Sequence, residues 1–310
     1  MRVRFSIWPN PTLSFTDVLR ISRHAADTGW DGVWFADHFM PNAGTADPLA
    51  PMLEAGSTLA ALAAAVPRVR LGSLVYGNTY RHPAVLANMA ATVDQISSGR
   101  FTLGVGAGWQ ENEHAQYGIT LPPVRERIDR FAEALVVLRG LLTEPVTSFS
   151  GEHYRLDAAV CQPKPVQDRL PIMIGAKGEQ RMLSLVAQHA DQWNCWGLPD
   201  VFRHKSGVLD QHCETQHRDP ASILRTAQAV IVPGTADEAA TKLAQLSMPA
   251  FGGSPDQLTE VVAGYAAARL DELIVPTGGL GSGDQVLDAM DLLMTEVFQP
   301  ATGAAGHRQP

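Results

Sequence analysis

The sequence predicts an α/β fold, a single (β/α)8 TIM barrel, on three observations. Eight short apolar runs alternate with segments of helical periodicity along the 310 residues. A strand followed by a helix, repeated, requires parallel strands joined by crossover helices, and eight such units suit one closed domain, expected over residues 1–300. The alternative, an open doubly wound sheet, favours a glycine-rich turn after the first strand, and residues 8–11 read Trp-Pro-Asn-Pro.

The first four strand–helix units occupy residues 3–142. Each apolar run is short, and apolar positions recur every three or four residues in the segment that follows it. The expected strands are 3–8, 32–37, 70–76 and 101–105. The expected helices are 16–28, 52–66, 84–96 and 125–142. In the last helix one side is a continuous apolar stripe, which predicts that this side packs on the barrel.

Residues 146–170 interrupt the alternation. Phe149, Tyr154 and Leu156 occupy alternating positions on either side of Gly151, and two prolines follow. This pattern predicts a hairpin inserted between the fourth helix and the fifth strand, with a stiff connector behind it.

The alternation resumes at residue 171. The expected strands are 171–174, 192–196, 226–232 and 272–275. The expected helices are 179–189, 201–216, 238–246, 258–268 and 285–298. The last ten residues, 301–310, are small and polar, so we expect a disordered tail.

Composition excludes several classes of function. The formal net charge is −8, which gives no electrostatic basis for binding nucleic acid or an anionic membrane. The longest apolar stretch, 55–66, is too short to span a bilayer, and the N-terminal residues lack the apolar core of a secretion signal. Three cysteines form no disulfide framework. We therefore expect a cytoplasmic protein that acts on a small molecule.

Asp37 and His38 follow the second predicted strand. Barrel enzymes carry their chemistry at the carboxyl ends of the strands, so these side chains are candidates for catalysis. His38 would donate or accept a proton, and Asp37 would orient the imidazole. The alternative is a loop histidine that only forms hydrogen bonds.

The fourth predicted strand ends in glycines at alternate positions. Gly104 and Gly106, followed by Ala107, leave one face of the strand end bare, which lets a flat ring lie against the backbone. Trp109 breaks the dinucleotide fingerprint G-x-G-x-x-G. Acidic residues and a histidine follow at 111–114, but their spacing matches no metal motif, so we expect no metal.

The next two strands end in a small-residue loop and an aromatic pair. Gly175, Ala176, Lys177 and Gly178 open a helix, where exposed amides favour a phosphate; a tight turn is the alternative interpretation. Trp193 and Trp196 suggest an apolar wall around Cys195, a thiol expected only to pack.

Taken together, these segments resemble the bacterial luciferase-like superfamily, and in particular its F420-dependent oxidoreductase branch. The resemblance rests on residues 36–39 (ADHF), 77–83 (GNTYRHP) and 103–109 (LGVGAGW) with Glu113-His114, and it extends over nearly the whole chain. It implies a barrel that binds the deazaflavin F420, or FMN, at the strand ends.

The resemblance also implies roles for individual residues. It places a non-prolyl cis peptide between Leu74 and Val75, in a bulge that backs the ring, and a cofactor contact at Asn112. Asn78 lies in the shared turn, and residues 175–178 match the loop that meets the coenzyme phosphate. His38 matches the active-site histidine of F420-dependent sugar-phosphate dehydrogenases. Those enzymes have a catalytic glutamate where this chain has Trp109, so their acid–base pair does not transfer. Their lysines for the substrate phosphate have no clear counterparts either, so a sugar phosphate is not indicated.

Three functions follow as alternatives. The first is an F420-dependent oxidoreductase, with Trp8, Trp109 and Trp196 around the substrate. The second is an FMN-dependent monooxygenase, which uses oxygen and needs a separate reductase. The third is a flavin-binding or deazaflavin-binding protein without turnover. The family also suggests a homodimer formed through helices near strands two and three, although burial within one chain explains the alanine-rich helix equally well.

Overall fold

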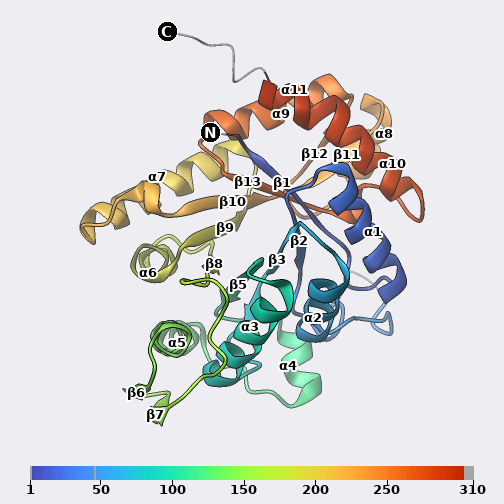
Figure 1. Ribbon diagram of the computed structural model, residues 1–310. Helices are drawn as coiled ribbons and strands as arrows, with labels where there is room; N and C mark the ends of the chain where they lie inside the picture. Colours follow the sequence, from blue (N-terminus) through green and yellow to red (C-terminus); the bar gives the residue numbers. More distant parts are fainter. Residues whose placement is uncertain (1, 45–46, 304–310) are drawn as a thin grey trace.

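A closed barrel of parallel strands, surrounded by helices, forms the centre of the molecule (Figure 1). The computed structural model describes residues 2–44 and 47–303. Within these ranges the barrel strands are β1 (Arg4–Trp8), β2 (Gly32–Phe35), β3 (Arg70–Ser73), β5 (Phe101–Gly106), β8 (Ile172–Gly175), β9 (Gln192–Trp196), β10 (Leu224–Gln228) and β13 (Glu272–Pro276). Their order in space is β3-β2-β1-β13-β10-β9-β8-β5, and pairing of β3 with β5 closes the barrel. The predicted fold class is confirmed.

Helices cover the outside of the strands, as the alternation predicts. They are α1 (Phe15–Thr28), α2 (Ala55–Ala65), α3 (Pro83–Ser97), α5 (Val124–Thr143), α6 (Arg181–His189), α7 (Pro199–Thr215), α9 (Pro255–Ala267) and α10 (Gln285–Leu292). Short 3-10 turns occupy Pro220–Ser222 and Thr277–Gly279. The boundaries follow local chemistry. Ser14 caps α1 by accepting the N–H of Asp17, and Pro83 begins α3 behind its cap, His82.

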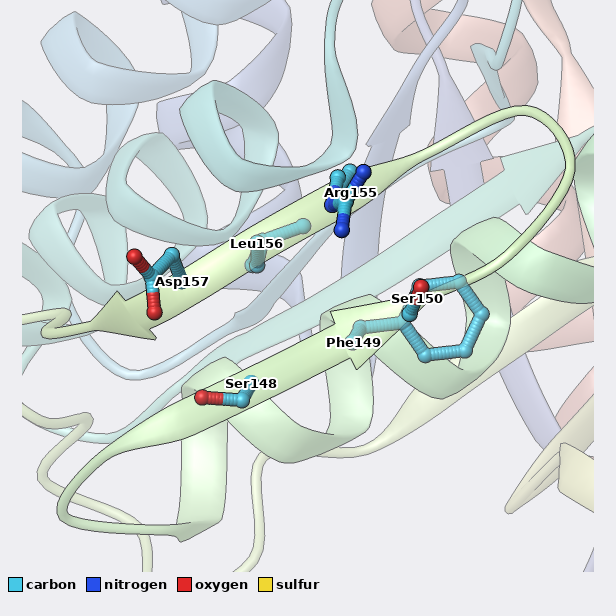
Figure 2. A pocket seen from close by; sticks show the side chains of 6 residues that line it. All are labelled: Ser148, Phe149, Ser150, Arg155, Leu156 and Asp157. Carbon is cyan, nitrogen blue, oxygen red and sulfur yellow. The ribbon is translucent and has the colours of Figure 1, made fainter.

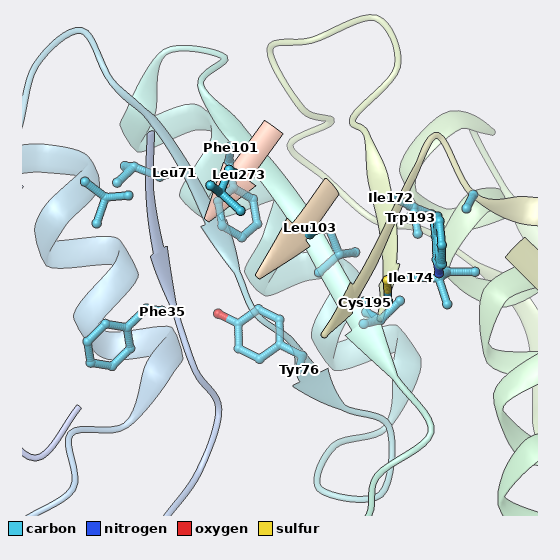
Figure 3. Packing of buried hydrophobic residues seen from close by; sticks show 14 of the residues in the cluster. Phe35, Leu71, Tyr76, Phe101, Leu103, Ile172, Ile174, Trp193, Cys195 and Leu273 are labelled. Carbon is cyan, nitrogen blue, oxygen red and sulfur yellow. The ribbon is translucent and has the colours of Figure 1, made fainter. Parts of the chain in front are cut away.

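Two apolar layers result from the alternation of side chains along each strand. The outward side chains, such as Leu71, Leu103 and Leu273, pack between the strands and the helices (Figure 3). The inward side chains form a separate small cluster of Trp34, Leu74, Met173 and Ile274, against which Trp8 and Val75 pack.

The inner layer also contains a buried ion cluster. Glu272 Oε1 accepts hydrogen bonds from Ser6 Oγ (2.5 Å) and Trp34 Nε1 (2.9 Å), and Arg70 donates to Oε2 (2.9 Å). Burial acts to raise the pKa of Glu272, but Arg70 and Arg4 outweigh it and hold the pKa below its usual range. The cluster joins four neighbouring strands.

Two predicted strands are divided in the structure. The predicted strand 70–76 is interrupted at Leu74 and Val75 and resumes as β4 (Tyr76–Gly77). The predicted strand 226–232 consists of β10 and then β11 (Val230–Pro233), which leaves the barrel and pairs in parallel with β12 (Ala250–Gly253). The strand β12 was not predicted, because two of its four residues are glycine.

The helices also differ from the prediction in three places. A short helix after β5, α4 (Glu111–Tyr117), was not predicted, because five of its seven residues are strongly polar and show no apolar period. After β11 comes α8 (Ala236–Leu243), somewhat shorter than predicted. The last predicted helix continues beyond α10 through a π-helical segment, Leu293–Phe298, into α11 (Gln299–Gly303). The expected tail is therefore helical as far as residue 303, and residues 304–310 lie outside the described part.

The predicted insertion is an antiparallel hairpin of β6 (Thr147–Ser150) and β7 (Arg155–Ala159). An open hollow of about 580 Å³ on it is lined only by hairpin residues (Figure 2). The hairpin is tied to the barrel, because Asn78 Nδ2 donates to Tyr154 Oη at 3.2 Å and Glu133 Oε2 accepts the Tyr154 N–H at 3.0 Å. The insertion therefore reaches the strand ends.

The predicted dimer interface involves the alanine-rich helix α2. Its large apolar side chains, Leu59 and Leu62, are buried within this chain, so folding of one chain already explains them. Among the described helices, none combines the length and apolar character needed to cross a membrane.

Candidate active site

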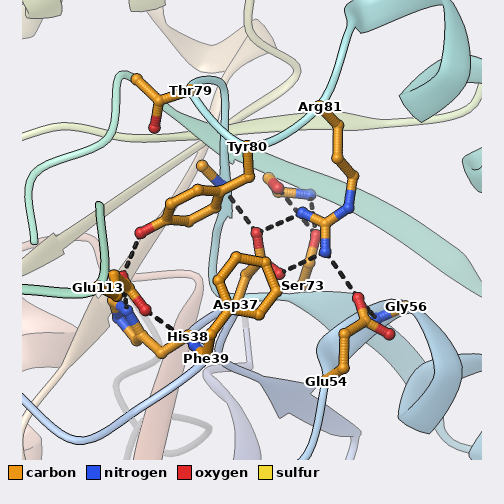
Figure 4. Close-up of polar contacts among 12 residues, drawn as sticks. Asp37, His38, Phe39, Glu54, Gly56, Ser73, Thr79, Tyr80, Arg81 and Glu113 are labelled. Atoms are coloured by element: carbon orange, nitrogen blue, oxygen red, sulfur yellow. Dashed lines mark hydrogen bonds and ion pairs between the residues drawn. The ribbon is translucent and has the colours of Figure 1, made fainter. Parts of the chain in front are cut away.

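His38 lies just beyond the carboxyl end of β2, in the position the sequence predicted. Its Nδ1 lies 2.8 Å from Oε1 of Glu113, which comes from α4 (Figure 4). A carboxylate accepts but does not donate, so Nδ1 carries the proton. The other ring nitrogen, Nε2, is then free to take up or release a proton.

Glu113 is the centre of this arrangement. Its side chain is fully buried, and it also accepts the N–H of Phe39 (2.8 Å) and the hydroxyl of Tyr80. Burial acts to raise the pKa of Glu113, but the hydrogen bonds from His38, Tyr80 and Phe39 outweigh it, so the pKa lies below its usual range. Burial and the neighbouring carboxylate raise the pKa of Tyr80, which stays a phenol and a donor. Glu113 is thus an ionised, fixed acceptor.

The expectation that Asp37 orients His38 is wrong. Both oxygens of Asp37 bind the guanidinium of Arg81, at 2.7 and 2.8 Å, and one also accepts the N–H of Gly77 at 3.0 Å. Arg81 in turn donates to Glu54 (2.6 Å). Successive residues of an extended backbone point to opposite sides, so Asp37 and His38 face different partners. Asp37 therefore anchors the turn after β4 and does not contact the imidazole.

The peptide bond between Leu74 and Val75 is cis, as the resemblance implied. It lies between β3 and β4, on the strand next to β2. Space for this bulge comes from the glycines of β5: a Cβ on Gly104 would stand 1.9 Å from the Ser73 carbonyl oxygen. A Cβ on Gly106 would come within 2.9 Å of a Val75 methyl group. Any larger residue at Gly104 would displace backbone.

The side chain of Val75 lies between two bare strand ends. Gly175, at the end of β8, also borders it closely, because a Cβ there would stand 3.1 Å from a Val75 methyl group. The small residues Ala107 and Ala176 follow the two glycines. Gly106 and Gly175 have no side chains, so the Val75 side chain fills the space beside both strand ends.

The loop after β8 is held by its backbone. Ala176 accepts from Trp193 Nε1 (3.0 Å), and the Lys177 carbonyl accepts from Lys205 Nζ (2.9 Å). The side chain of Lys177 is exposed, as is Gly178. Lys205 also pairs with Glu179 (2.8 Å). The loop thus has a rigid backbone and one exposed ammonium group ahead of α6.

Two asparagines predicted to meet a cofactor lie just after β4 and in the first turn of α4. Asn78 is 6% exposed and donates to Tyr154. Asn112 donates to the Pro41 carbonyl oxygen (2.9 Å), while its own Oδ1 is buried without a hydrogen-bond partner. An unsatisfied buried acceptor is costly, so Asn112 is suited to a donor that is not part of the protein.

Tryptophans stand on two sides of the strand ends. Trp109 is 57% exposed and touches His38 edge-on, with ring centroids 5.6 Å apart. Trp8 and Trp196 contact each other at 5.8 Å. Trp193 does not belong to this wall, because it points outward and stacks on Phe202 of α7. Burial raises the pKa of the Cys195 thiol to about 12, in line with a packing role.

The sequence pattern raised Glu113 and His114 as metal ligands and as part of the family resemblance, and it predicted no contact between Glu113 and His38. In the structure His114 is buried, with Nδ1 2.6 Å from the Gln110 carbonyl oxygen and Nε2 2.8 Å from Thr79 Oγ1. It links α4 to the turn after β4. Among the described residues, no three His, Cys, Asp or Glu side chains are grouped so as to hold a metal.

Comparison with known proteins identifies the family. The sequence profile of a family described as luciferase-like monooxygenase matches residues 2–296. The chain belongs to this family. An F420-dependent glucose-6-phosphate dehydrogenase of Amycolatopsis mediterranei is 35% identical over 165 residues, covering 52% of this chain and 48% of the relative. A pyrimidine monooxygenase of Allorhizobium ampelinum is 36% identical over 141 residues, covering 45% and 38%.

Solved structures show the same luciferase-like fold. An F420-dependent secondary alcohol dehydrogenase, in complex with an F420–acetone adduct, superposes with a TM-score of 0.83 at 19% identity, covering 97% of this chain and 99% of the other. At that identity the likeness concerns the fold. The chain spans about half the length, or less, of the curated relatives cited here.

Proposed function

We propose that this chain is an oxidoreductase that binds coenzyme F420 at the carboxyl ends of its barrel strands and exchanges hydride between it and a small organic substrate. The observation that carries the proposal is the fixed imidazole of His38, which buried Glu113 holds at the carboxyl end of β2. Family membership and the F420-dependent relatives support the choice of coenzyme.

The residues at the strand ends fit a flat ring with a phosphate-bearing tail. Leu74, Val75, Gly106 and Ala107 would back the ring, because the glycines leave Val75 as the adjacent side chain. Asn78 and Asn112 would offer amide groups, and the unpartnered Oδ1 of Asn112 suits a ring donor. Within residues 175–178, the amides of Lys177 and Gly178 and the Lys177 ammonium group would meet the phosphate, because the Ala176 N–H already bonds the Asn194 carbonyl oxygen.

When bound, F420 supplies a ring carbon that carries two electrons as hydride. The chain supplies the proton chemistry. With Nδ1 held by Glu113, Nε2 of His38 accepts the hydroxyl proton when an alcohol is oxidised and returns it when a carbonyl is reduced. The ionised Glu113 stabilises the imidazolium that forms. Trp109, in contact with the ring of His38, shields it from water on one side.

The family description and the pyrimidine monooxygenase relative favour a second candidate, an FMN-dependent monooxygenase served by a separate reductase. Titration of the purified chain with F420 and with FMN, followed by ring fluorescence, distinguishes the two. F420 binding without oxygen uptake supports the proposal. FMN binding with oxygen uptake by the reduced form supports the monooxygenase. Binding without turnover on any substrate supports a flavin-binding or deazaflavin-binding protein that does not catalyse a reaction. A homodimer remains part of the proposal and is tested by sedimentation.

His38→Ala tests the proposed catalytic residue. Loss of a general acid–base group lowers turnover by about 10²–10⁴-fold, measured as oxidation of reduced F420 by a panel of aldehydes, ketones and quinones. His24→Ala is the matched control, because His24 lies on α1 and pairs with Asp291 on the outside of the barrel. Unchanged turnover in His38→Ala, with F420 still bound, contradicts the assignment.

A further inference from the structure

Two buried polar atoms at the carboxyl end of the barrel have no hydrogen-bond partner in the structure, Nε1 of Trp8 and Oε1 of Gln228. We propose that Gln228, with Trp8 and Trp196, forms a substrate subsite for an uncharged, flat compound bearing a carboxamide-like group. This inference rests on the proposed function, since it names the substrate class of the same site.

The side chain of Gln228 points into the barrel. Along β10, Thr226 bonds inward to Asn194 and lies near Met173 of the inner cluster, whereas Arg225 bonds outward to Ser206 and Asp210 on α7. Side chains alternate along a strand, so Gln228 shares the inward face of Thr226. It is the last residue of β10 and is only 7% exposed.

Trp196 lies beside Gln228 on the neighbouring strand, and Trp8 contacts Trp196. Gln228 is in register with Trp196 on β9 and with Ile274 on β13, and two residues further along β13 Pro276 pairs with Trp8. The rings of Trp8 and Trp196 meet at 5.8 Å and an interplanar angle of 57°. Trp196 is supported from behind by the apolar cluster of Val230, Val232 and Ala239. The aromatic pair and Gln228 therefore come from neighbouring strand ends on the inward side of the barrel.

The chemistry of these groups defines the ligand. The amide oxygen of Gln228 and the indole N–H of Trp8 are buried without partners and have lost their bonds to water. A ligand that offers one donor and one acceptor restores both. The strand ends on either side, Pro276, Trp196 and Gly175, are uncharged. Bare aromatic faces favour planar compounds, and a neutral site disfavours an ion. A neutral aromatic amide meets all of these conditions.

Calorimetric titration of the full chain with benzamide tests the subsite, and benzoate is the charged isostere. Gln228→Met removes the amide and keeps an unbranched side chain of similar size. The matched control is Gln192→Met: Gln192 is also buried, also has an unpartnered Oε1, and begins β9 at the opposite end of the barrel. Trp8→Phe keeps an aromatic ring and removes the N–H. Thermal unfolding of each variant reports folding.

We expect wild type and Gln192→Met to bind benzamide more tightly than benzoate, and Gln228→Met and Trp8→Phe each to bind benzamide about tenfold more weakly. Absence of benzamide binding to wild type overturns the inference. So does equal affinity in folded Gln228→Met, or an equal loss in Gln192→Met. F420 is titrated separately. Failure of F420 binding overturns the proposed function, whereas benzamide binding that depends on Gln228 stands as evidence for the subsite itself.

Discussion

Replacing Glu113 by glutamine tests whether this carboxylate holds His38. The substitution keeps the shape of the side chain and exchanges one acceptor oxygen for an NH2 donor. The carboxylate accepts from His38 Nδ1 and the Tyr80 hydroxyl on one oxygen and from the Phe39 N–H on the other. Whichever way the amide turns, its NH2 group faces either the Phe39 N–H or the protonated Nδ1 of His38, and His38 avoids this only by moving its proton from Nδ1 to Nε2.

The magnitude follows from these contacts. A buried donor without an acceptor costs about 1–3 kcal/mol, and the remaining bonds lose their charge assistance, so the free energy of unfolding should fall by about 2–4 kcal/mol at neutral pH. Urea unfolding measures it. The matched control is Glu111→Gln, an exposed residue in the first turn of the same helix, which should change stability by less than about 0.5 kcal/mol. Equal effects of the two substitutions would refute the reasoning.

The dependence on pH gives a second check with a defined sign. The folded pKa of Glu113 lies below its usual value, so its contribution to stability is complete above the unfolded pKa of about 4.3 and is lost as pH falls through the folded pKa. Protonated Glu113, like glutamine, presents a donor. The stability difference between wild type and Glu113→Gln should therefore shrink in acid, and a difference that persists at low pH contradicts the assignment. Nitrogen NMR of His38 should show the proton on Nδ1 in wild type.

Two further predictions concern the barrel itself. Gly104→Ala places a Cβ 1.9 Å from the Ser73 carbonyl oxygen, so we expect thermal and urea unfolding to show a loss of about 3 kcal/mol or more. Gly278→Ala, where a Cβ meets nothing within 4 Å, should be nearly neutral; comparable losses in the two would show that the contact is not the cause. Glu272→Gln leaves Arg70 without its buried anion and should cost about 3–5 kcal/mol in urea unfolding. The exposed Glu260→Gln is the comparison, and a cost below about 1 kcal/mol for Glu272→Gln would count against the buried ion cluster.

Much of the fold could be predicted because its signals are local. The strand β9 was predicted at Gln192–Trp196, and the structure has the same boundaries, since a short apolar run between a helix and a loop has one interpretation. β12 and α4 were missed for the opposite reason. The two glycines of β12 carry no strand signal, and its pairing with β11 is formed between segments about 20 residues apart.

The candidate site likewise has features that local sequence predicts and features that depend on long-range contacts. Position 38 at a strand end, the bare face of Gly104 and Gly106, and the loop at 175–178 are visible in the sequence, because strand ends and glycines are local features. The bond from His38 to Glu113 is not, because the two residues are 75 positions apart in the chain. Sequence adjacency favoured Asp37 as the partner, and the alternation of the backbone turned that side chain toward Arg81.

The sequence by itself determined the alternation of strands and helices, and with it a parallel barrel whose chemistry lies at one end. Apolar periodicity is a local property of the sequence, so it can be recognised without knowledge of the tertiary contacts. Only the tertiary structure decided which carboxylate meets the imidazole, which tryptophan faces inward and which buried amide lacks a partner. Those outcomes depend on the register between strands and on closure of the barrel, which bring distant residues within hydrogen-bond distance.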